Sequence, residues 1–122
     1  MTTTPHFPFF RPPQGAFPPD EVQITELRGE AEPDGRRVRV LLAVAPFQQP
    51  PHLSVTLAQA GAGVLAFTTI IEPVTQQITF NLHANPHLEP GDYTLMAELT
   101  YPETEISHSM TWTGTWKPTP EK

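Results

Sequence analysis

Cysteine is absent from this chain of 122 residues. Its absence excludes disulfide frameworks, thiol nucleophiles and zinc sites built on thiolates. Basic residues are also scarce, since seven Lys and Arg stand against thirteen Asp and Glu, for a net charge of −6. Binding to a phosphate backbone needs clustered Lys and Arg, so this balance argues against a nucleic-acid-binding protein. The one basic cluster, Arg36, Arg37 and Arg39, has acidic neighbours in sequence.

Long apolar runs are missing as well. No run reaches the length of about 18 residues that marks a transmembrane helix, so we expect no membrane insertion. Residues 1–20 lack the basic start and apolar stretch of a secretory signal. We therefore expect the cytoplasm by default, and an extracellular location if the chain is a processed or excised domain. A period of 3.6 residues is also lacking, which predicts no long helix.

Proline is abundant, with sixteen residues, more than twice the usual share of about 5%. The prolines gather outside the apolar runs, which indicates a folded centre with extended or turn-rich ends. The length fits one domain. We divide the chain into an extended arm rich in proline and phenylalanine over residues 1–20, a β-sandwich over residues 21–116 and a polar tail over residues 117–122.

The arm interleaves its prolines with Phe7, Phe9, Phe10 and Phe17. Proline removes backbone donors and favours an extended conformation. Four phenylalanines are too many for a free solvated tail, because contiguous exposed apolar surface is rare. The arm either lies along its own domain or docks on another protein or a second copy of this chain. We expect these phenylalanines to bind a partner.

Asp34-Gly35 is a strong turn signal between two runs of alternating residues. Folding the chain at this turn sorts charged and apolar residues onto separate faces at a single register. The apolar residues Val22 and Ile24 are out of phase with this register, which predicts a bulge near Thr25-Glu26. The expected pairs are Glu32–Arg37 and Glu30–Arg39 on one face, and Ala31–Val38, Gly29–Val40 and Leu27–Leu42 on the other.

Further strands follow from alternation of apolar and polar residues with turn signals at short spacing. One segment, residues 64–71, is apolar on both faces, so we expect it to be covered on both sides or to lean on the N-terminal arm. Together these segments predict seven strands and an all-β, antiparallel sandwich. Beyond the first hairpin, the predicted strands are residues 53–58, 64–71, 74–82, 91–101 and 106–116.

The segment Leu88-Glu89-Pro90-Gly91-Asp92-Tyr93 resembles the turn into the sixth strand of a bacterial immunoglobulin-like or fibronectin type III-like module. The resemblance covers residues 21–116 and implies a seven-stranded immunoglobulin-like sandwich. It gives Tyr93 the role of the tyrosine corner, with its hydroxyl bonded to the backbone a few residues upstream. The chain departs from antibody domains, because it has no cysteine pair and no tryptophan in the third strand.

Candidates for chemistry are few, and we expect no enzyme, no metal and no cofactor. His83 and His87 have a metal-like spacing, but Asn85-Pro86 between them prevents the helix that would align them. The serines offer no triad, because His108 points to the opposite face from its neighbours Ser107 and Ser109. The remaining histidines and serine, expected to be ordinary loop or strand residues, are His6, His52 and Ser54.

We expect a non-catalytic protein-interaction or structural module, an accessory subunit or domain of a larger assembly. Trp112 is expected in the core, and Trp116, near the chain end, is a candidate partner-binding residue. An alternative is a carbohydrate-binding module that uses the exposed aromatics Trp116 and Tyr101. A third reading is a small hydrolase or metalloenzyme built on the histidines.

Overall fold

The computed structural model describes residues 14–71, 75–102 and 104–117. These residues form seven strands and one short 3-10 helix, Pro19–Glu21. Among them, no helix has the length and apolar character needed to span a bilayer. The strands are β1 (Ile24–Ala31), β2 (Arg37–Val44), β3 (His52–Gln59), β4 (Gly63–Ile71), β5 (Gln77–His83), β6 (Gly91–Thr100) and β7 (Ser107–Trp116).

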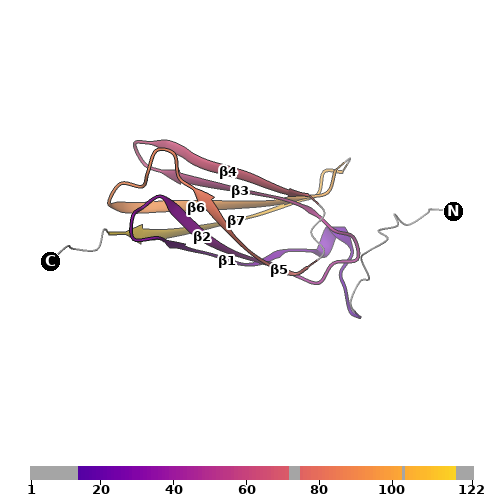
Figure 1. Cartoon of the computed structure of the whole chain (residues 1–122). Coiled ribbons are helices and arrows are strands. Elements are labelled where there is room, and N and C mark those ends of the chain that lie inside the picture. The colour runs from indigo at the N-terminus through magenta and orange to yellow at the C-terminus, as the bar shows by residue number, and fades with distance from the viewer. Residues whose placement is uncertain (1–13, 72–74, 103, 118–122) are drawn as a thin grey trace.

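The strands pair into two antiparallel sheets, as expected for a β-sandwich (Figure 1). One sheet has the order β1-β2-β5 and the other β4-β3-β6-β7. The four edge strands of the two sheets meet in pairs across the two layers, since β1 contacts β7 and β4 contacts β5. The sandwich therefore has two open sides, which we call the β1/β7 side and the β4/β5 side.

The β1–β2 hairpin has the register that the sequence predicts. Charged residues face outward and valines face the core, so the hydrophobic pattern fixes the pairing. The register shifts between Ile24 and Glu26, which confirms the predicted bulge. The observed pairs include Leu27–Leu42, Gly29–Val40, Glu30–Arg39 and Ala31–Val38.

The turn of this hairpin is centred one residue earlier than predicted. The amide of Gly35 donates to the carbonyl of Glu32 at 2.9 Å, which places Pro33-Asp34 at the centre of the turn. Gly35 then adopts a φ of 70°, a conformation that favours glycine. The Asp34 carboxylate accepts a bond from the Arg36 amide at 2.9 Å. Asp34 and Gly35 thus both shape the turn, in different positions from those expected.

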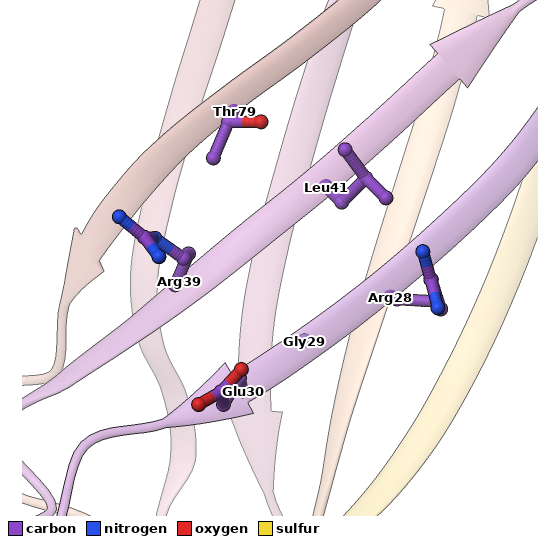
Figure 2. A pocket seen from close by; sticks show the side chains of 6 residues that line it. All are labelled: Arg28, Gly29, Glu30, Arg39, Leu41 and Thr79. Atoms are coloured by element: carbon purple, nitrogen blue, oxygen red, sulfur yellow. The ribbon is translucent and has the colours of Figure 1, made fainter.

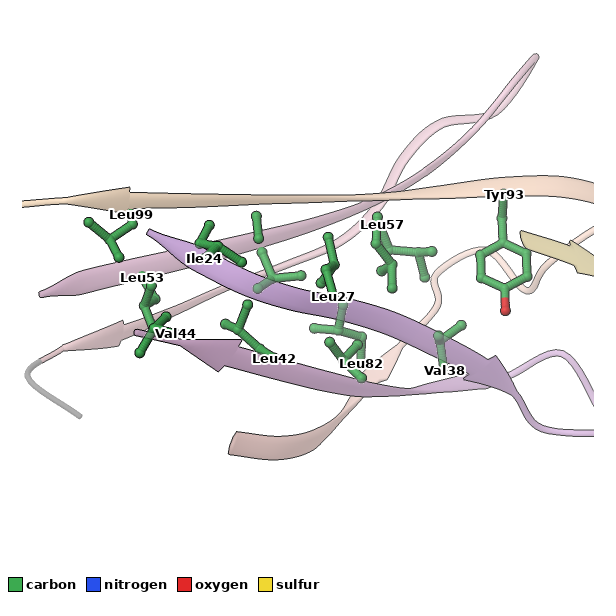
Figure 3. Packing of buried hydrophobic residues seen from close by; sticks show 14 of the residues in the cluster. Ile24, Leu27, Val38, Leu42, Val44, Leu53, Leu57, Leu82, Tyr93 and Leu99 are labelled. Atoms are coloured by element: carbon green, nitrogen blue, oxygen red, sulfur yellow. The ribbon is translucent and has the colours of Figure 1, made fainter. Parts of the chain in front are cut away.

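The core lies between the sheets and is built mainly by β2, β3 and β6 (Figure 3). These strands alternate buried and less buried residues, the pattern of a sheet with one covered face. Full burial of a Val or Leu side chain stabilises a fold by roughly 1.5–3 kcal/mol. The side chains with no exposed surface are Val38, Val40, Leu42, Val55, Leu57, Leu95 and Leu99.

Two strand predictions need correction. β5 begins at Gln77, and the predicted first residue, Val74, lies outside the described residues. β4 is not covered on both sides, because Val64, Phe67 and Ile71 are 62%, 63% and 64% exposed. The reason is that a sandwich of two sheets covers one face of each, and no third layer of described residues lies over the outward face of β4. The predicted alternative, contact with the N-terminal arm, falls largely on residues 1–13, which lie outside the described residues.

The turn into β6 is held by Gln59 of β3. The Gln59 side-chain amide donates to the carbonyls of Glu89 and Asp92 at 2.7 and 3.1 Å, and its oxygen accepts from the Glu89 amide at 2.8 Å. Tyr93 instead projects between the sheets (Figure 3). The Ala31 backbone of β1 lies near its hydroxyl and lowers the pKa of that hydroxyl, against the larger effect of burial, which raises it. Tyr93 therefore reaches from β6 towards the opposite sheet.

Candidate interaction surfaces

Trp116, the predicted partner-binding residue, is tied to the first hairpin. Its indole nitrogen donates to the carbonyl of Glu32 at 3.1 Å. Its ring lies against the hairpin turn, so that a methyl group added at Gly35 would be 2.9 Å from the ring. At the other end of the same side, the Ile24 amide donates to Nδ1 of His108 at 3.1 Å. Two side chains of β7 thus bond the backbone of β1 and its turn at opposite ends of the β1/β7 side.

Trp112 fills the middle of the β1/β7 side, as a partly buried residue packed against the core. Its ring meets the Tyr93 ring edge to face, with centroids 5.7 Å apart and an interplanar angle of 61°. The ring covers Gly114 of its own strand and approaches Gly29 of β1. Both glycines leave the space that this large ring occupies. Trp112 therefore packs against the core, as predicted, but it lies at the edge of the core and is only partly buried.

Tyr101 is buried, and its hydroxyl donates to the carbonyl of Gln49 at 2.8 Å. It follows the end of β6, whereas Trp116 pairs with Gly91 at the start of that strand. The ten residues of β6 separate these ends, and at about 3.4 Å per residue the separation is roughly 30 Å. The structure therefore does not bring Trp116 and Tyr101 into one aromatic platform.

Alkaline pH is expected to destabilise the fold through the tyrosines. Burial raises the pKa of Tyr101 to about 12 and also raises the pKa of Tyr93, from ordinary values of 10.0. Because the folded state holds these protons more tightly, their stabilisation is complete below pH 10.0 and is lost as pH rises towards about 12. Tyr93 and Tyr101 are the only tyrosines in the chain, so tyrosinate absorbance reports on them alone.

The measurement is a spectrophotometric pH titration beside chemical denaturation at several alkaline pH values. Tyr101→Phe is the matched control, and it should reduce the loss of stability between pH 10 and about 12. A native titration midpoint at the ordinary tyrosine pKa would contradict the prediction.

The outward face of the four-stranded sheet has an unusual composition. Large apolar side chains are exposed on β4, as given above, and Met96 of β6 is 51% exposed. Thr56 of β3 lies between Phe67 and Met96 in one row across the sheet. The other outward positions on β3, β6 and β7 are mostly hydroxyl residues, namely Ser54, Thr94, Thr100, Ser107, Ser109, Thr111, Thr113 and Thr115.

Charges on this outward face are few and of one sign. Glu98 and Asp92 of β6 are exposed there, and no described outward position of the sheet carries Lys or Arg. Asp92 is engaged by Thr115, whose hydroxyl donates to the carboxylate at 2.6 Å. A nearly uncharged face with grouped apolar residues is typical of a surface that another molecule covers.

The arm meets the domain at the connection between β2 and β3. Phe17 pairs with Phe47 in a parallel bridge, its amide donating to Pro46 at 2.8 Å and its carbonyl accepting from Gln48 at 2.9 Å. Phe17 remains 41% exposed. The other candidate partner-binding residues of the arm, Phe7, Phe9 and Phe10, lie outside the described residues.

The outward face of the three-stranded sheet has a different character. Figure 2 shows an open depression there, lined by side chains of β1, β2 and β5. Arg28 and Arg39 flank it, and Glu30 lies beside them. Arg28 also meets Glu26 at 3.4 Å. Mixed charge and exposure make this face an ordinary solvated surface, unlike the opposite one. The depression is lined by Arg28, Gly29, Glu30, Arg39, Leu41 and Thr79.

The histidines are dispersed over the fold. His52 begins β3, His83 ends β5, and His87 lies in the connection that follows. His108 is bonded to the Ile24 amide through Nδ1. No group of three or more His, Asp or Glu side chains in the described part of the chain could hold a metal ion. His6 lies outside that part.

Sequence reasoning missed the exposed apolar face. The signal lies in residues 64–71, whose apolar residues fall on both faces and predict either cover on both sides or contact with the N-terminal arm. No protein-family model matches the chain, and no curated protein matches it.

Proposed function

We propose that this chain is a non-catalytic protein-interaction or structural module, an immunoglobulin-like or fibronectin type III-like sandwich that serves a larger assembly. The strand order supports the fibronectin type III-like form. Antibody constant domains place the fourth strand beside the fifth, whereas β4 here pairs with β3. The arm provides a second contact with the partner through its phenylalanines.

The observation that carries the proposal is the outward face of the four-stranded sheet. Phe67 and Met96 are both more than half exposed and lie in one row across three strands. Burying apolar surface releases about 25 cal/mol per Å², so such a row favours contact with another protein. The hydroxyl residues around it supply hydrogen bonds without the desolvation cost of charges.

The experiment is affinity capture from native cells, with the partner identified by mass spectrometry. Met96→Glu places a charge in the centre of the face and should reduce capture of a specific partner at least tenfold. Thr79→Glu, on the outward face of the other sheet, is the matched control and should leave capture unchanged. Equal capture by both variants, or no specific partner for the unaltered chain, would overturn the proposal.

A second test concerns the arm. Deleting residues 1–13 leaves the pairing of Phe17 with Phe47 in place and is expected to weaken capture of the same partner severalfold while the thermal unfolding midpoint stays unchanged. Isothermal titration with the identified partner measures the change. Unaltered affinity after the deletion would remove the arm from the proposed interface.

A further inference from the structure

The two open sides of the sandwich differ in the bonds that connect the two sheets there. On the β1/β7 side, His108 and Trp116 bond the backbone of β1 and its turn at both ends. On the β4/β5 side, the connection that follows β5 bonds β4 through the backbone, from the Asn85 amide to the Leu65 carbonyl at 2.9 Å. Beyond Leu65, β4 continues for six residues, Ala66–Ile71, as the terminal strand of its sheet.

β4 lacks the devices that usually prevent edge strands from pairing. Natural proteins protect such edges with charged residues, prolines, short length or bulges. β4 is nine residues long and contains no charged residue and no proline. Its irregularity lies near Leu65, opposite the register shift between Leu57 and Ala58, so Ala66–Ile71 is regular. β5, the edge strand beside it, also carries no Asp, Glu, Lys or Arg.

The distribution of charge favours a second copy of this chain as the molecule that pairs with the free edge of β4. The chain carries a net charge of −6, so two copies repel each other over most of their surfaces. No Asp, Glu, Lys or Arg occurs from Val40 to Ile71. The β4/β5 side is therefore the place where a second copy meets no like charge from either sheet. An antiparallel strand is also self-complementary, as a two-fold interface requires.

We propose that β4 pairs with β4 of a second copy, in an antiparallel register with the two-fold axis at Thr69. This inference rests on the proposed function and names a second copy of this chain as a partner. The register places Phe67 opposite Ile71 of the other copy and Thr68 opposite Ile70. The Phe67–Ile71 pair lies on the outward face and joins an aromatic residue to a β-branched one, a favourable cross-strand arrangement. The Thr68–Ile70 pair lies on the inward face.

The pairing joins the two four-stranded sheets into one continuous sheet. It brings four apolar side chains together on the outward face, Phe67 and Ile71 from each copy. Since Phe67 and Ile71 are 63% and 64% exposed in the single copy, pairing removes apolar surface from water. The pairing also gives hydrogen-bond partners to the backbone N–H and C=O groups at the free edge of β4, which face no described strand of its sheet.

The test uses charge exchange at Thr69, an exposed residue of β4. Sedimentation velocity of the purified full chain over a concentration series should show a reversible dimer. Thr69→Lys and Thr69→Glu each set like charges opposite each other at the axis, and each should weaken dimerisation at least tenfold. An equimolar mixture of the two variants should restore it, because opposite charges then face each other. Thr111→Lys and Thr111→Glu on the distant β7 are the matched controls and should dimerise like the unaltered chain.

A monomeric unaltered chain at several hundred micromolar, or failure of the mixture to restore the dimer while circular dichroism shows folded variants, would overturn the proposal. Loss of the dimer on deletion of residues 1–13 would also overturn it, since the N-terminal segment would then be the occupant. Neither result affects the capture experiment with Met96→Glu, which reads a different protein in a cell extract. Failure of the dimer and failure of the proposed function are therefore distinguishable.

Discussion

Replacing Gly29 with valine is expected to lower the free energy of unfolding by about 3 kcal/mol, the upper end of the usual cost of overfilling a core. A methyl group at Gly29 would lie 2.7 Å from Cδ1 of Leu95, 3.0 Å from the Trp112 ring and 3.2 Å from Cγ1 of Val38. Leu95 and Val38 have no exposed surface, so they have little room to move. Since domains are stable by about 5–15 kcal/mol, this loss is a large share of the total.

Chemical denaturation measures the loss, and a double-mutant cycle with Leu95→Val tests its cause. The shorter valine lacks the Cδ1 atom that the new methyl group would meet. The cost of Gly29→Val should therefore be smaller in the Leu95→Val background than in the unaltered chain. Additive costs would show that the close approach between these two positions is not responsible. Glu30→Ala, at the exposed neighbouring position, should change stability by less than about 0.5 kcal/mol.

Trp116→Ala is expected to cost about 3 kcal/mol, the lower end of the range for removing a buried large aromatic, because the side chain is only half-buried. The change removes the packing of the ring on Gly35 and the bond to the Glu32 carbonyl. Trp116→Phe keeps most of the ring and should cost about 1 kcal/mol, the usual worth of one hydrogen bond. Thermal and chemical denaturation of the three proteins measure the difference.

An equal cost for the alanine and phenylalanine variants would contradict this division between packing and hydrogen bonding. No loss in either would mean that the last strand closes the sandwich without Trp116. In that second case the tryptophan would again become available as a contact residue for a partner.

Local patterns in the sequence predict much of this fold. The first hairpin is specified by the order of Glu30, Ala31, Val38 and Arg39, because only one register separates the charges from the apolar residues. The all-β class follows from the alternation of the later strands and the lack of helical periodicity. The bulge after Ile24 was also readable, since it corrects a mismatch of phase within a few residues.

The contacts that close the sandwich were not predictable in the same way. Trp116 meets Glu32 across 84 residues, and Gln59 meets Glu89 across 30. Such pairs depend on which strands become neighbours in space, and alternation carries no information on that. The candidate surface shows the same limit. The pattern of residues 64–71 predicts an apolar strand, but only the sheet order shows that this strand lies at an edge.

The arrangement of β1 beside β7 has a mechanical consequence. Ile24 meets His108 and Glu32 meets Trp116, so the two strands run in the same direction, and the described chain leaves the sandwich at opposite ends (Figure 1). A force applied through Gln14 and Lys117 would slide β1 along β7 lengthwise. Both side-chain bonds and the Trp112 ring would then resist extension at once, instead of parting one after another. Pulling from these two ends should therefore load the molecule in shear, its more resistant geometry.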